Sequence, residues 1–316
     1  VTALTVTEDR ADLATLNGTT GISLATTNIT VTDAVSLSQA QTINGYTTGT
    51  VTLNSVSDTV SNLATLAAID NAEVTIAGAA ISVSDAASLA NANTINNYTT
   101  GQVTLTSVSD TVANITSIDG LTTTEVTMAG ATVSITDTGA SKAQVDTVNG
   151  FTTGTVTPTS ISEDKADITT LQGTAGISLA TTNITVTDQV NKSEADTINN
   201  YTTGQVVLNS SSMTVTELAA VEALNDSEMK FADDGAISVS DAANLTNANT
   251  INNYTTGQVT LTSVSDTVAN ITSIDGLTTT QVSMAGATVS ITDTGASKTQ
   301  VDTVNGFTTG TVTPTS

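Results

Sequence analysis

The sequence contains no histidine, cysteine or tryptophan, and only six of its 316 residues are lysine or arginine. Without histidine or cysteine, general-base and thiol catalysis lose their usual carriers. The six basic residues are scattered, and none recurs beside a distinctive acidic or aromatic group. We therefore predict that the chain is not an enzyme.

Aromatic residues and positive charge are both scarce, with four tyrosines, three phenylalanines and a formal net charge of −24. A compact domain of this length normally buries several large aromatics, so this composition favours thin stacked repeats with a narrow aliphatic core. The negative charge argues against nucleic acid or anionic lipid as a partner. No apolar run reaches the length of a membrane span, and we predict none in this segment.

The chain is internally repetitive. Residues 259–311 repeat residues 103–155 with three substitutions in 53 positions, Glu125/Gln281, Thr127/Ser283 and Ala143/Thr299. A longer period of about 156 residues contains six coils, alternately short and long, so that twelve coils fill the chain. These begin near residues 1, 22, 51, 74, 103, 126, 156, 177, 206, 229, 259 and 282. A period in the twenties is typical of a solenoid.

Each coil changes its apolar spacing partway along. Val51 and Leu53 alternate with polar residues, as in a strand, whereas Val60, Leu63 and Leu66 recur every three residues, as in a short helix or 3₁₀ segment. We predict a repeat solenoid of about twelve coils, specifically a right-handed parallel β-solenoid of the α/β type with a short helical segment per coil. It would be one continuous solenoid, with a first super-repeat at 1–155, a second at 156–311, and the start of a further coil at 312–316.

An acidic column marks the point where strand gives way to helix. It comprises Glu8, Asp33, Asp58, Asp85, Asp110, Asp137, Glu163, Asp188, Asp241, Asp266 and Asp293, with Met213 as the exception. One interpretation is helix N-capping, since a carboxylate accepts hydrogen bonds from free backbone N–H groups. The other is that calcium bridges the stacked aspartates, which makes the nine aspartates candidate calcium ligands and calcium the one candidate cofactor. The nonapeptide and EF-hand calcium motifs are missing.

A second column reads Tyr/Phe-Thr-Thr-Gly and closes every long coil. Its aromatics, Tyr46, Tyr98, Phe151, Tyr201, Tyr254 and Phe307, are predicted structural corners. The aromatic would plug the interior while the glycine turns the chain into the next strand. The alternative is a carbohydrate-binding row, but phenylalanine replaces tyrosine, so the hydroxyl is dispensable.

One coil departs from the pattern. The coil that begins near 229 carries an inserted residue within Phe231-Ala232-Asp233-Asp234-Gly235. An extra residue in a strand predicts a turn at a β-bulge.

The phrases VSDTVANI (108–115 and 264–271), ITVTD and ADTINNYTTGQV (195–206) resemble the tandem SDTxANI-type repeats of giant bacterial cell-surface and secreted, adhesin-like proteins. The resemblance covers essentially the whole chain and carries no catalytic residues. It implies an extracellular, cell-surface structural module that forms a stalk, surface layer or filament. The alternatives are an adhesin shaft that binds polysaccharide or another cell surface, and a virion fibre segment. Expected partners are copies of the chain or adjoining repeats, end to end.

Overall fold

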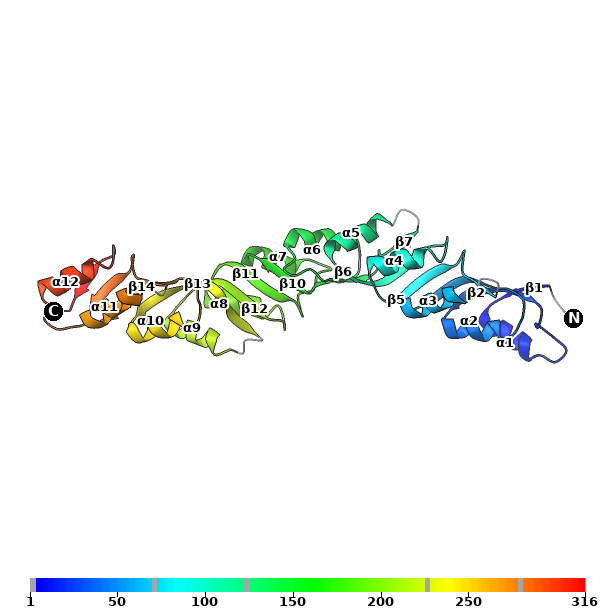
Figure 1. The fold of residues 1–316 in the computed structure, drawn as a ribbon, viewed down its shortest axis with the longest axis horizontal. Coiled ribbons are helices and arrows are strands. Elements are labelled where there is room, and N and C mark those ends of the chain that lie inside the picture. Colours follow the sequence, from blue (N-terminus) through cyan, green and yellow to red (C-terminus); the bar gives the residue numbers. More distant parts are fainter. Residues whose placement is uncertain (1–3, 70–72, 122–124, 225–227, 278–280, 316) are drawn as a thin grey trace. The chain divides into compact units, whose positions relative to one another are not determined.

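The computed structural model describes residues 4–69, 73–121, 125–224, 228–277 and 281–315. The chain divides into two compact units, one comprising Val1–Asp137 with Ala143–Pro158 and the other Thr138–Lys142 with Thr159–Ser316. In each unit strands and helices alternate along the chain (Figure 1), and the strand pairs among the described residues are parallel.

The first unit has a sheet in the order β1-β2-β3-β5-β6-β8-β9, with β4 beside β3 and β7 beside β6. Its elements are β1 (Thr5–Glu8), α1 (Arg10–Gly18), β2 (Asn28–Val35), α2 (Leu37–Asn44), β3 (Val51–Asp58), α3 (Val60–Ala68), β4 (Val74–Thr75), β5 (Ala80–Ala87), α4 (Leu89–Asn96), β6 (Val103–Asp110), α5 (Val112–Gly120), β7 (Val126–Thr127), β8 (Thr132–Ile135), α6 (Lys142–Asn149) and β9 (Val156–Pro158).

The second unit has a sheet in the order β10-β11-β12-β13-β14-β16-β17, with β15 beside β14. Its elements are β10 (Ser160–Glu163), α7 (Lys165–Gly173), β11 (Asn183–Val190), α8 (Lys192–Asn199), β12 (Val206–Met213), α9 (Val215–Glu222), β13 (Met229–Ala243), α10 (Leu245–Asn252), β14 (Val259–Asp266), α11 (Val268–Gly276), β15 (Val282–Ser283), β16 (Thr288–Ile291), α12 (Lys298–Asn305) and β17 (Val312–Pro314). The first residue of α6, Lys142, also belongs to this unit.

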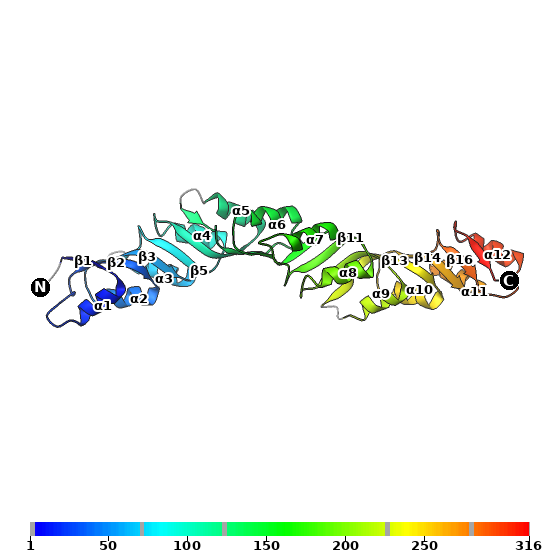
Figure 2. The ribbon, with the colours of Figure 1, turned by 180° about the vertical axis from the view of Figure 1, so that it is seen from behind.

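The core of each unit lies between its sheet and a layer of helices. In β3, Val51, Leu53 and Val56 are buried, and so are Leu63 and Leu66 of α3. Helix α2 contacts β3, and α3 contacts the next long strand, β5. Consecutive helices contact one another from α1 to α5 and from α7 to α12, so each run of helices forms one layer (Figures 1 and 2). The intervening strand positions, mostly threonine and serine, lie on the opposite face of the sheet.

The helix starts coincide with residues that favour N-cap positions. The helices begin after Ser, Thr, Asn or Asp N-caps such as Thr59, whose side chain accepts from the Asn62 N–H, and they run for eight or nine residues. In the described part of the chain no helix has both the length and the apolar character that a membrane crossing requires.

The prediction of a parallel β-solenoid is wrong. The structure is a repeated α/β fold with two parallel sheets, in which a full α-helix follows each strand segment and covers one face of the sheet. The alternating pattern identified one buried face per strand, but it did not specify what covers that face. Helices of eight or nine residues are long enough to supply that cover, so no second wall of strands is needed.

Candidate functional site

The carboxylate column links each segment to the one before it. The first backbone N–H of a helix donates to the carboxylate of the strand segment that follows it, at 2.6–2.9 Å. The ten pairs are Arg10 to Asp33, Leu37 to Asp58, Val60 to Asp85, Leu89 to Asp110, Val112 to Asp137, Lys142 to Glu163, Lys165 to Asp188, Val215 to Asp241, Leu245 to Asp266 and Val268 to Asp293. The column therefore caps the preceding helix, while other residues cap each segment's own helix.

Local strand geometry aims these carboxylates. Asp33, Asp85, Asp188 and Asp241 lie where the ladder shifts register, for example between Val31 and Ala34 of β2. Asp58, Asp110 and Asp266 are instead the last residues of their strands. A bulge and a strand end both turn the side chain out of the ladder, toward the neighbouring helix.

Three of the aspartates are held from two sides. Asp58 accepts from the Leu37 N–H with one oxygen, and from the Thr59 N–H and the Asn62 amide with the other, all at 2.8–2.9 Å. Asp110 and Asp266 repeat the arrangement. Burial alone would raise the pKa of these carboxyl groups, but the three hydrogen bonds outweigh it and lower the pKa of each below its usual value of 3.8.

The candidate calcium ligands are not gathered into a cluster. Among the described residues, no group of three or more Asp, Glu, His or Cys side chains is placed to hold a metal ion. The oxygens named above are directed at backbone N–H groups one segment away. The geometry that the structure gives to the aspartates is thus that of helix caps.

The segment with Met213 breaks the column. Met213 is fully buried at the position where the other short coils carry an aspartate or a glutamate, so α8 has no carboxylate from the following strand. Two residues earlier on the same strand face, Ser211 replaces the buried valine of Val56, Val108 and Val264. Its hydroxyl oxygen is buried with no hydrogen-bond partner.

The Tyr/Phe-Thr-Thr-Gly corners depend on their first threonine. Thr99 Oγ1 donates to the Ala79 carbonyl at 2.6 Å and accepts from the Gly101 N–H at 2.8 Å. Equivalent pairs form at Thr47, Thr152, Thr202, Thr255 and Thr308. A Cβ on Gly101 would lie 2.3 Å from the Ala79 carbonyl oxygen, so only glycine allows the two backbone segments to approach this closely.

The six aromatic corner residues are half-buried, whereas the threonine after each is more deeply buried at five of the six corners. The sequence predicted that the aromatic rings fill the interior, but the structure places them only half inside it. At one corner Tyr254 stacks on Phe231, with ring centroids 6.2 Å apart and an interplanar angle of 10°. Burial, and secondarily the charge of Glu222, raises the pKa of Tyr254.

The inserted residue forms the expected bulge in β13. Leu208 pairs with Phe231 and Ser210 with Ala236, so the one residue between them on β12 faces four residues, 232–235. A pocket of about 380 Å³ lies beside this bulge, lined by Asp233, Asn252, Asn253, Tyr254, Thr255 and Thr256.

The same corner involves Glu125/Gln281, one of the three substitutions between residues 103–155 and residues 259–311. In the first copy the Asn96 amide donates to Glu125 at 2.9 Å. In the second copy Gln281 replaces that glutamate and has a positive φ of 91°, while the Asn252 side-chain oxygen is buried without a partner.

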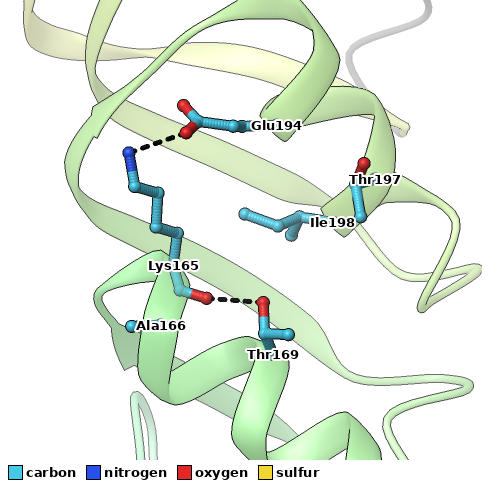
Figure 3. Close-up of a pocket in the computed structure, with 6 residues that line it drawn as sticks. All are labelled: Lys165, Ala166, Thr169, Glu194, Thr197 and Ile198. Carbon is cyan, nitrogen blue, oxygen red and sulfur yellow. Dashed lines mark hydrogen bonds and ion pairs between the residues drawn. The ribbon is translucent and has the colours of Figure 1, made fainter.

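A groove of about 490 Å³ lies between α7 and α8. Figure 3 shows Lys165 reaching from α7 to Glu194 on α8, an ion pair of 2.9 Å, with Thr169, Thr197 and Ile198 along the groove. The bond to Glu194 raises the pKa of Lys165, while bonds from the Asn191 N–H and Lys165 lower the pKa of Glu194.

The first unit has the corresponding groove between α1 and α2, with Arg10, Gln39 and Ile43 in place of Lys165, Glu194 and Ile198. Gln39 carries no charge, so the ion pair is not reproduced, although its side-chain oxygen caps the Ser36 N–H as Glu194 caps the Asn191 N–H. Because the charged pair differs between two otherwise equivalent grooves, it does not define a common ligand chemistry.

What recurs through both units is thus a set of bonds between segments. Comparison with family models, curated proteins and solved structures gave no match.

Proposed function

We propose that the chain is an extracellular structural repeat module that forms a rigid stalk, surface layer or filament. The observation that supports this role is the carboxylate column, in which ten described helices are each capped by the following segment. Each cap joins residues 21–26 positions apart, so separating neighbouring segments breaks a charge-assisted hydrogen bond as well as strand pairing.

The corners add a second series of links. Each corner threonine bonds to a carbonyl 20 or 21 residues earlier, and its partner glycine allows the two backbones to approach closely. Within each unit, parallel pairing, carboxylate caps and corner bonds together connect neighbouring described segments, as a structure that transmits tension requires. The resemblance to adhesin-like repeats supports a location on a cell surface or outside the cell.

The test is single-molecule force spectroscopy on the chain held by terminal handles. We expect stepwise unfolding at measurable force, and the variant Asp110→Ala should lower the force of the steps from its own unit. A chain that extends smoothly at negligible force would contradict the proposal. Antibody labelling of intact source cells tests the location, since labelling that requires permeabilised cells contradicts a surface role.

A second candidate function, contact with polysaccharide, is favoured by the open face of the first sheet. Thr7, Thr30, Thr52 and Thr75 lie in register across four strands of that sheet. A groove of about 240 Å³ farther along the same sheet, over β6, β8 and β9, is lined by Ser107, Thr132, Val133, Ser134, Thr155 and Thr157. Retention of the purified chain on a glycan surface, abolished by Thr52→Val with Thr157→Val, would favour this function over a purely structural one.

A further inference from the structure

Two equivalent corners, one in each unit, carry pockets of similar size. We name the pocket beside the bulge of β13 the Tyr254 pocket; its volume is about 380 Å³. The corner after α4 carries a pocket of about 420 Å³, the Tyr98 pocket, lined by Ala67, Thr75, Ile76, Ala77, Asn97 and Tyr98. Both volumes lie in the range of small-ligand sites, about 300–1,000 Å³. The sequence around the two pockets differs at three places, and each difference changes what the pocket offers to a ligand.

The first difference is a carboxylate. Asp233 occupies the position of Ala77, three residues before the residue that pairs with a serine of the preceding strand. The Asp233 carbonyl accepts from the Thr256 N–H at 2.6 Å and from the Thr256 hydroxyl at 2.7 Å, as the Ala77 carbonyl accepts from Thr100. The corner thus fixes the Asp233 backbone, while its side chain lines the pocket and is 94% exposed.

The second difference is an aromatic support behind the corner tyrosine. Phe231 stands where the first unit has Ile76, and it is 5% exposed. The Tyr254 ring stacks on the Phe231 ring with an interplanar angle of 10°. Tyr254 itself is half-buried and lines the pocket. The buried ring therefore holds Tyr254 in place, and the remaining part of the Tyr254 ring faces the pocket as an apolar platform.

The third difference is an amide without its anchor. In the first unit the Asn96 amide donates to Glu125, whereas Gln281 replaces that glutamate in the second. The Asn252 side-chain oxygen is buried and has no hydrogen-bond partner among the described residues, and Asn252 lines the pocket. Without the glutamate to hold it, this amide is available to turn toward the hydroxyl of a ligand, and it would gain the hydrogen bond that it lacks.

These groups select a class of ligand. The carboxylate and the amide oxygen accept hydrogen bonds, so the ligand must offer several O–H or N–H donors, and the Tyr254 ring favours an apolar C–H face. Asp233 is the charged residue among the six that line the pocket, and the chain has a net charge of −24, which disfavours an anion. Quaternary ammonium ions are bound by cages of several aromatic faces, but Phe231 lies nearly parallel to Tyr254 and the pair does not form a cage.

We propose that the Tyr254 pocket binds a neutral pyranose unit of a glycan. The C–H face of the sugar packs on the Tyr254 ring, and its hydroxyls donate to the Asp233 carboxylate and to the Asn252 amide oxygen. The site goes beyond the structural role, because it supplies a specific attachment point on the module. It is also distinct from the threonine rows on the open face of the first sheet, since it lies at a corner of the second unit.

Saturation-transfer NMR on the full chain tests the proposal with uncharged probes: methyl β-D-glucopyranoside, methyl β-D-galactopyranoside and methyl α-D-mannopyranoside. We expect one or more of them to bind with a dissociation constant on the order of 1 mM, as suits a small, open site. Choline and methyl β-D-glucuronide serve as the cationic and anionic probes. Each should bind at least about tenfold more weakly than the best neutral glycoside.

The first unit supplies the matched variants. Asp233→Ala introduces the residue that the Tyr98 pocket has, at an exposed side chain, so the fold should be unaffected. We expect it to weaken glycoside binding at least about tenfold. Tyr254→Ala should do the same, whereas Tyr98→Ala, which removes the same ring from the other pocket, should leave the affinity unchanged. Circular dichroism checks that each variant is folded.

Three results would overturn the proposal: no neutral glycoside binds at up to about 20 mM, well above a millimolar dissociation constant; choline or the glucuronide binds more tightly than the neutral glycosides; or Asp233→Ala binds them like the wild type. The open-face variant, Thr52→Val with Thr157→Val, should bind the probes as the wild type does. Equal loss of binding in that variant would place the sugar on the sheet instead. None of these results alters the force measurement on the single chain, so the structural function is tested separately.

Discussion

At the scale of single residues, one buried side-chain oxygen of β12 lacks a hydrogen-bond partner. Ser211 has a buried hydroxyl without a partner at a position that is valine in β3, β6 and β14. An unpaired buried hydroxyl costs about 1–3 kcal/mol. We expect Ser211→Val to raise the free energy of unfolding in urea by about 1 kcal/mol, allowing for some strain against the nearby Met213.

The reciprocal variant controls that measurement. Val264→Ser, at the equivalent position of β14, should lower the free energy of unfolding because it creates the same unpaired hydroxyl and a small cavity. If both variants shifted stability in the same direction, the hydroxyl would not be the cause.

Two glycines test how closely backbones approach at the corners. A Cβ on Gly101 would lie 2.3 Å from a backbone oxygen, whereas a Cβ on Gly78 would meet nothing within 4 Å. Gly101→Ala should destabilise the first unit by at least about 2 kcal/mol. Gly78→Ala should be neutral or slightly stabilising, because alanine restricts the unfolded chain. Thermal melts followed by circular dichroism check this, and equal melting temperatures for the two variants would contradict it.

The corners also show what residue patterns do and do not reveal. Hydrophobicity places Tyr98 inside and Thr99 outside, yet Thr99 is buried, because its hydroxyl has two backbone partners. The aspartate column is visible as a column, but its partners are not. Capping rules search within a few residues, and the donors to these aspartates lie 21–26 residues earlier.

At the scale of elements, the first N–H of ten described helices is capped by an acid of the next strand segment, and nearly all of these helices also have an N-cap residue of their own. The change in apolar spacing after Asp58 separates β3 from α3 in the sequence. The spacing could not decide whether the buried strand face would meet strands or helices, since either can cover it. That choice depends on packing between segments, and it is where the prediction of a β-solenoid went wrong.

The doubly held aspartates predict a dependence of stability on pH. The folded pKa of Asp58, Asp110 and Asp266 lies below 3.8, their usual value. Their contribution is therefore fully present above the unfolded pKa and is lost as the pH falls through the folded pKa. We expect the melting temperature to fall as the pH is lowered below about 4.

The triple variant Asp58→Asn, Asp110→Asn and Asp266→Asn isolates these groups. It should be less stable at neutral pH, by about 1 kcal/mol per site, because each amide replaces a charged acceptor. Its melting temperature should fall less steeply in acid than that of the wild type. Parallel pH profiles for both proteins would show that other carboxylates carry the acid sensitivity.

At the scale of the whole molecule, charge is the dominant long-range term. The chain has thirty acidic and six basic residues, so most carboxylates have no cation to pair with. Ion pairs of the described residues include Lys165–Glu194, Lys192–Asp196, Lys230–Asp233 and Lys298–Asp302. The second and fourth are helical i,i+4 pairs, which contribute little to stability individually. Added salt weakens those pairs and the attraction of aspartates for helix N-termini, but it also screens a net charge of −24.

Because unpaired negative charges greatly outnumber the ion pairs, we expect the screening of repulsion to have the larger effect on stability. We expect the melting temperature to rise between low salt and about 0.5 M sodium chloride, where the Debye length has shrunk to a few ångströms. The measurement belongs at a protein concentration at which the chain sediments as a monomer, so that association does not contribute. A melting temperature that falls with salt would mean that the carboxylate caps, rather than net repulsion, dominate the electrostatic free energy of folding.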